Sequence, residues 1–156
     1  MTLRPLLLCF ALLAGCSFAP ESRPLVAVAL TGRPAAKLTD KQVQALFSAT
    51  NREVTAGGFH GPADQQQSHG YTLTGGPLYR AGFLWLPGFG CSSTFSDRQA
   101  LVRFYEYAQP NGSGRFVAPE AQRRAVRALA ARIEASLRRS VPTGFEVQVG
   151  VEFPSI

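Results

Sequence analysis

The sequence predicts an α+β domain, in which a mainly antiparallel sheet carries two or three helices on one face. Three observations lead to this fold class. Residues 119–139 repeat apolar positions at helical spacing, residues 145–153 alternate like a strand with one buried face, and residues 25–30 form a short apolar run. A helix and then a strand at the end of the chain, with strands earlier, favour helices packed on one side of such a sheet.

Residues 119–139 give the clearest helix. Pro119 occupies the first helical position, Glu120 lies in the first turn, and Arg138 and Arg139 lie in the last turn, as the helix dipole favours. One apolar stripe is formed by Val126, Leu129, Ala130, Ile133 and Leu137. The turn at residues 142–144 leads into the strand 145–153, whose expected buried face consists of Phe145, Val147, Val149, Val151 and Phe153.

Earlier in the chain, the run 25–30 is bounded by turn residues and predicts a strand. Thr39 with Gln42 has the form of a capping box, and the apolar spacing after it predicts a helix over 40–49. Residues 57–76 are rich in Gly, Gln and Ser and are expected to form a loop, apart from a possible strand at 71–74. That strand would form a hairpin with a buried strand at 78–86, which Pro87 and Gly88 end.

Residues 96–108 allow two interpretations. Ser96 and Gln99 repeat the capping-box pattern, and Leu101, Phe104, Tyr105 and Ala108 have helical spacing, which favours a helix. The same residues have high β-propensity, and the Asn-Gly pair at 111–112 would close a hairpin with residues 116–117. We favour the helix and keep the strand as the alternative.

Residues 1–16 have the layout of a secretory signal peptide. Arg4 precedes an apolar segment at 6–13, which is too short to span a membrane. The segment ends in Leu13-Ala14-Gly15-Cys16, which resembles the lipobox of bacterial lipoproteins. The resemblance covers these residues only. It implies a diacylglyceryl group on the Cys16 thiol and cleavage just before Cys16, and the two acyl chains suffice for stable anchoring.

The lipobox divides the chain into a signal peptide (1–15), a lipidated tether (16–24) and a single α+β domain (25–156). Ser17 rather than Asp follows Cys16, so the resemblance implies the outer membrane, with the domain facing the periplasm. The alternatives are an ordinary signal peptide that happens to end in Cys, and an apolar segment of the fold.

The chain is basic, with 16 Lys and Arg against 10 Asp and Glu, and removal of the signal peptide takes away only Arg4. In an envelope this charge would meet anionic headgroups or acidic proteins, and nucleic acid is not expected as a partner. The helix 119–139 carries the candidate binding residues Arg124, Arg127, Arg132, Arg138 and Arg139. These arginines form either a solvated helix face or a docking surface for an anionic membrane or an acidic partner.

Catalytic and metal-binding candidates are weak. Cys91, expected in a flexible loop over 88–93, would be a nucleophile only if His60 or His69 activated it, with Asp64 orienting the ring. The two histidines and Asp64 match none of the compact spacings of zinc sites, so no metal and no cofactor is expected. Only three aspartates are present, which is few for a glycosidase.

Aromatic residues concentrate between residues 79 and 107, either as the core of the domain or as a groove for sugars or a protein partner. Our leading hypothesis is a non-enzymatic envelope lipoprotein that binds another protein or an envelope polymer, such as an inhibitor, an immunity protein or an accessory subunit. The alternative is a periplasm-facing hydrolase that uses Cys91 with a loop histidine. A structural spacer is a third, weaker possibility.

Overall fold

A five-stranded antiparallel sheet and two helices make up the structure, a computed structural model that describes residues 21–61, 79–109 and 114–152. The predicted α+β class is confirmed. The strands lie side by side in the order β2-β3-β4-β1-β5, and every neighbouring pair is antiparallel. Along the chain the elements are β1 (Ser22–Gly32), α1 (Asp40–Ala56), β2 (Arg80–Leu86), β3 (Phe89–Phe95), β4 (Gln99–Tyr107), α2 (Glu120–Ser140) and β5 (Phe145–Gly150).

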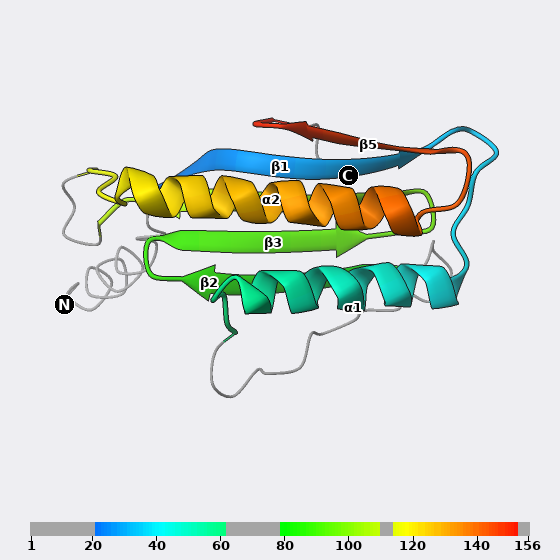
Figure 1. The fold of residues 1–156 in the computed structure, drawn as a ribbon, viewed down its shortest axis with the longest axis horizontal. Coiled ribbons are helices and arrows are strands. Elements are labelled where there is room, and N and C mark those ends of the chain that lie inside the picture. Colours follow the sequence, from blue (N-terminus) through cyan, green and yellow to red (C-terminus); the bar gives the residue numbers. More distant parts are fainter. Residues whose placement is uncertain (1–20, 62–78, 110–113, 153–156) are drawn as a thin grey trace, which may run out of the picture.

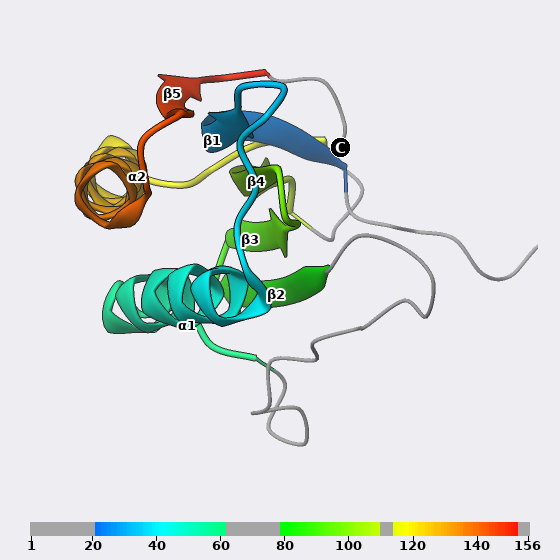
Figure 2. The same ribbon diagram turned by 90° about the vertical axis from the view of Figure 1, so that its right-hand side faces the viewer.

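Both helices lie on the same side of the sheet (Figures 1 and 2). Helix α1 contacts β2 and β3, helix α2 contacts β1 and β5, and the two helices also contact each other. We call the covered side the helix face and the other side the open face. No helix within the described residues is long and apolar enough to cross a membrane.

The capping box predicted at the start of α1 is present. The backbone N–H of Thr39 donates to the Gln42 side chain at 2.8 Å, and Gln42 returns a hydrogen bond to the Thr39 hydroxyl at 3.3 Å. The helix continues to Ala56 rather than ending near residue 49, because Thr50 and Val54 extend the buried stripe by two more turns. Helix α2 agrees with its predicted range to within one residue, and all five residues of its predicted stripe are buried.

The helix favoured over residues 96–108 is wrong, and this segment forms strand β4. Ser96 does cap a local turn, since its hydroxyl accepts from the backbone N–H of Arg98 at 3.3 Å and of Gln99 at 3.2 Å. The turn joins β3 to β4 and does not begin a helix. The strand is favoured because β4 pairs on both sides, with β3 and with β1, and buries its helix-face side chains Ala100, Val102, Phe104 and Glu106.

Three other strands differ from their predicted form. Strand β1 begins at Ser22, within the predicted tether 16–24, and pairs from there with β4. Strand β2 is an edge strand with no fully buried residue, although a buried strand was expected at 78–86. Val149 and Val151 were expected inside but are 44% and 55% exposed, because β5 lies at the opposite edge. The predicted strand at 71–74 and its hairpin lie outside the described residues.

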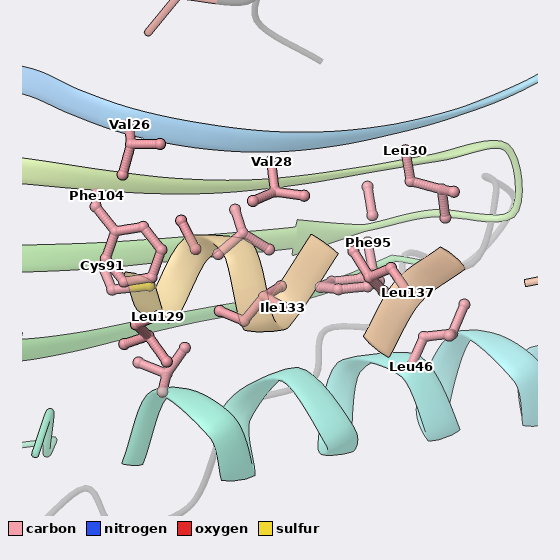
Figure 3. Packing of buried hydrophobic residues seen from close by; sticks show 14 of the residues in the cluster. Val26, Val28, Leu30, Leu46, Cys91, Phe95, Phe104, Leu129, Ile133 and Leu137 are labelled. Atoms are coloured by element: carbon pink, nitrogen blue, oxygen red, sulfur yellow. The ribbon is translucent and has the colours of Figure 1, made fainter. Parts of the chain in front are cut away.

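The core lies between the helix face and the two helices (Figure 3). Phe47 of α1 meets Phe95 of β3 edge to face, with ring centroids 5.7 Å apart. Phe59, just after α1, meets Phe104 of β4 in the same way at 5.6 Å. This packing joins α1 and the residues after it to the inner strands β3 and β4. The alternate side chains of each strand point to the open face.

Candidate binding surface

Strand alternation divides the aromatic residues of β2, β3 and β4 into two sets. Phe89, Phe95 and Phe104 point to the helix face and are fully buried. The positions between them point to the open face. There the strands place four aromatic side chains, which we call the aromatic patch: Phe83, Trp85, Tyr105 and Tyr107. Strand alternation therefore places one set of the aromatic residues in the core and leaves the other set on the open face.

The aromatic patch is exposed at its edge-strand side. Phe83 is 51% exposed and Trp85 is 41% exposed, which is unusual for side chains of this size. Gly90 lies between Trp85 and Tyr105 in the strand register. A Cβ on Gly90 would lie 2.7 Å from the Tyr107 ring and 3.0 Å from Phe83, so both rings pass over this glycine. Sheet geometry thus gathers the four rings on one surface.

His60 extends the aromatic patch beyond the edge strand. Its backbone forms an isolated antiparallel bridge with Trp85, with N–H to O distances of 2.9 Å in both directions. The His60 ring packs against the Trp85 indole, with centroids 4.5 Å apart and an interplanar angle of 64°. The position of Trp85 is therefore fixed by its backbone and by its neighbour while part of the ring stays open to solvent.

Polar groups accompany the rings on the open face. The Ser92 hydroxyl lies 3.4 Å from the Tyr105 hydroxyl, and Arg103 is paired with Ser92 in the strand register. Burial, and secondarily the nearby Tyr105, raises the pKa of Tyr107 above its usual value, so its phenol stays neutral in the physiological range. Trp, Tyr and Arg, which all occur on this face, are the residue types enriched in binding hot spots. This surface is suited to stacking and burial against a partner.

Cys91 is not in a flexible loop, as was expected, but in the buried strand β3. Its side chain is 2% exposed and lies on the helix face, in the cluster that includes Phe104 and Leu129 (Figure 3). Burial in this apolar environment raises the pKa of the Cys91 thiol far above its usual range. A neutral, enclosed thiol is a poor nucleophile. The loop was predicted because Gly and Ser dominate the segment, yet Cys91 and Ser93 fill helix-face positions of a fully paired strand.

The structure does not bring Cys91 and His60 together. Trp85 and Cys91 belong to neighbouring strands but point to opposite faces of the sheet, and the His60 ring lies on the Trp85 side. His69 and Asp64 lie outside the described residues. Within the described ranges, no three His, Cys, Asp or Glu side chains are grouped as a metal site would require.

The five candidate arginines lie on the solvent side of α2, opposite its buried stripe. Three of them are held by carboxylates: Arg127 by Glu120 at 3.3 Å, Arg132 by Glu53 at 3.7 Å and Arg138 by Glu134 at 2.8 Å. Glu120 pairs with Arg123 and Arg127 rather than with Arg124, although Glu120 and Arg124 have the spacing of an ion pair. Arg124 and Arg139 form no ion pair with the described part of the chain.

A buried carboxylate between two arginines was missed by the sequence analysis. Glu106 is 0% exposed on the helix face, and it accepts from Arg23 of β1 at 2.7 Å and from Arg123 of α2 at 2.8 Å. Burial alone would raise the pKa of Glu106, but hydrogen bonds from Arg123 and Arg23 and their charges hold it below the usual value. Recognition of β4 as a strand would have placed this glutamate at an inward position.

Comparison of the chain with protein-family models, with curated proteins and with solved structures finds no match. The function must therefore be inferred from the residues and their geometry.

Proposed function

We propose that this chain is a lipid-anchored lipoprotein of the bacterial envelope, held in the outer membrane on the periplasmic side. Its small α+β domain binds another protein or an envelope polymer without catalysing a reaction. The anchor is proposed from the lipobox at 13–16 and from the Arg4 charge and the short apolar segment that precede it. The binding role is proposed from the aromatic patch.

The exposure of the aromatic patch is the observation that carries the binding role. A solvated sheet face of a monomeric domain ordinarily carries polar side chains, since antiparallel sheets alternate apolar-in with polar-out. Here Phe83 and Trp85 leave half or nearly half of their surface in water. Complete burial of an exposed side chain of this kind contributes about 1.5–3 kcal/mol, so burial of the remaining exposed half of each ring against a partner would contribute about 1 kcal/mol.

The hydrolase alternative lacks comparable support. It requires a reactive Cys91 thiol next to a histidine, and the described residues offer a buried thiol on the face opposite His60. General-base activation needs the two groups within hydrogen-bond reach, directly or through one water.

The binding role is tested with a photo-crosslinking amino acid placed at Phe83 in the full chain in cells. The matched control carries the same amino acid at Ala128, an exposed residue on the outer side of α2. We expect a discrete crosslinked product from position 83 and none from position 128. Equal crosslinking, or none, from both positions would contradict the assignment. Trp85 is the only tryptophan of the chain, so its fluorescence gives an independent reading once a ligand is in hand.

The anchor is tested by metabolic labelling with a palmitate analogue. The wild-type chain should take up the label and fractionate with the outer membrane, and Cys16→Ala should lose both properties. Cys91→Ala is the matched control, because it removes a thiol that the proposal leaves unmodified. Label retained by Cys16→Ala would contradict the lipid anchor.

A further inference from the structure

We propose that the anchored domain stands on the membrane with one particular end down, and that this end docks on anionic phospholipid headgroups. The anchor end, as we name it, comprises Glu21 with the start of β1, residues 114–119, and the first turns of α2 as far as Arg124. This inference rests on the proposed lipid at Cys16 and adds an orientation and a second contact with the bilayer.

The chain is fastened to the domain from Glu21 onward. The Glu21 carbonyl accepts from the backbone N–H of Ala108 at 2.8 Å. Two residues later, the Arg23 guanidinium donates twice to the buried Glu106, at 2.7 and 2.9 Å. The same guanidinium lies over the Phe116 ring, 4.3 Å from its centroid. The chain is therefore held to the domain from Glu21 onward.

This short tether fixes which end of the domain lies near the bilayer. Five Cα–Cα steps from Cys16 to Glu21 reach about 17 Å even when fully extended. Helix α2 has 21 residues. It therefore spans about 30 Å. Strand β1 and α2 begin at the same end of the domain (Figure 1), where Glu106 joins Arg23 to Arg123. An inverted domain, with the C-terminal end of α2 on the membrane, would need a longer tether.

Tether length alone leaves the domain free to stand or to lie flat, and the surface of the anchor end favours standing. Val117 is 52% exposed there, and Arg115 and Arg124 of the same end are exposed as well. Glu21 is an exposed acid of this end and offsets one of these two charges. Glu120 is neutralised by Arg123 and Arg127. A basic surface with an exposed apolar side chain, next to acyl chains, suits the headgroup region of an anionic bilayer. Basic residues also occur at the far end, so Val117 and the tether, rather than charge alone, select the anchor end.

The orientation is tested with the lipidated full chain in phosphatidylcholine vesicles that contain phosphatidylglycerol. A fluorophore is attached at Ala121→Cys in one sample and at Ser140→Cys in another, both exposed sites on α2. The two sites are about 28 Å apart along the helix. Cys91 is buried and its thiol stays unlabelled in the folded chain. Headgroup spin-labelled lipid should quench the label at position 121 strongly and the label at position 140 little.

Variants distinguish docking from simple proximity. Arg124→Gln should lower the ratio of docked to undocked protein about fivefold, the effect of one basic residue at an anionic surface. Arg139→Gln, the same change at the far end of α2, should leave it unchanged. Omission of phosphatidylglycerol or addition of salt should reduce the difference in quenching between the two ends, because the contact is between exposed charges.

The outcomes separate this inference from the function on which it rests. If the chain floats with vesicles but the two labels are quenched equally, the domain lies flat or moves freely and the orientation is overturned alone. If Arg124→Gln and Arg139→Gln have equal effects, docking through the anchor end is overturned. If the wild-type chain does not float with vesicles, that result contradicts the lipid anchor and, with it, the orientation that depends on the anchor.

Discussion

Arg123 donates to both oxygens of the Glu106 carboxylate, from Nη2 to Oε1 at 2.8 Å and from Nε to Oε1 at 3.1 Å and Oε2 at 3.3 Å. Because Glu106 belongs to β4 and is fully buried, this contact ties the first turn of α2 to an inner strand of the sheet. Arg23 completes the cluster from β1. Three elements far apart in the sequence thus meet at one carboxylate.

Removal of that carboxylate should be strongly destabilising. Glu106→Ala leaves the Arg23 and Arg123 guanidinium groups without their partner in a partly enclosed site. Breaking a buried pair from one side costs about 3–5 kcal/mol, and we expect the lower end because both arginines retain some solvent. Urea unfolding measures the loss. Glu120→Ala is the control, since its contacts are exposed and its loss should cost about 0.5 kcal/mol. Equal losses for the two variants would contradict this account.

The same carboxylate should make stability depend on acid. The pKa of Glu106 is lower in the folded chain than its usual value of 4.5. The contribution of Glu106 to the free energy of unfolding is therefore complete at pH values above its pKa in the unfolded chain. It is lost as the pH falls from that value through the lower pKa of the folded chain. At pH values below about 4.5, the unfolding free energy of the wild type should decrease as the pH is lowered. Glu106→Gln should lose less over the same range, because it cannot take up this proton. Parallel pH profiles for the two proteins would exclude Glu106 as a source of the acid sensitivity.

The Cys91 thiol should react only when the chain unfolds. Burial keeps it protonated and out of contact with reagents, because its pKa is raised far above the usual range. In a chain with Cys9→Ser and Cys16→Ser, we expect a thiol reagent to label folded protein at least about a thousandfold more slowly than urea-unfolded protein. Rapid labelling of the folded chain would reveal an accessible thiol and revive the hydrolase alternative.

Gly90 should be required for the shape of the aromatic patch. The methyl group of Gly90→Ala would lie 2.7 Å from the Tyr107 ring, so Tyr107 must move outward. We expect a loss of about 1 kcal/mol in urea unfolding, since the ring is partly exposed and can yield. The near-UV circular dichroism of the aromatic residues should change as well. Ser92→Ala, at the next open-face position of β3, should change the unfolding free energy and the near-UV spectrum only slightly. An unaltered near-UV spectrum for Gly90→Ala would contradict the close approach.

Local sequence patterns determined the elements whose partners lie nearby in the chain. The capping box at Thr39 and Gln42 began α1, and the stripe ending at Leu137 gave α2, because helix periodicity and caps depend on residues three or four apart. The same pattern at Ser96 and Gln99 was misleading. A serine hydroxyl that accepts from backbone N–H groups two and three residues on stabilises a hairpin turn as readily as a helix start.

By itself the sequence determined the α+β class, both helices of the described chain and the expectation of a lipid anchor. Only the tertiary structure decided that β3 and β4 are inner strands, because strand pairing joins residues far apart along the chain. That pairing placed Cys91 inside and Trp85 outside, and it buried Glu106 between Arg23 and Arg123. Whether a side chain faces the core or the solvent in a strand depends on register, and long-range contacts fix the register.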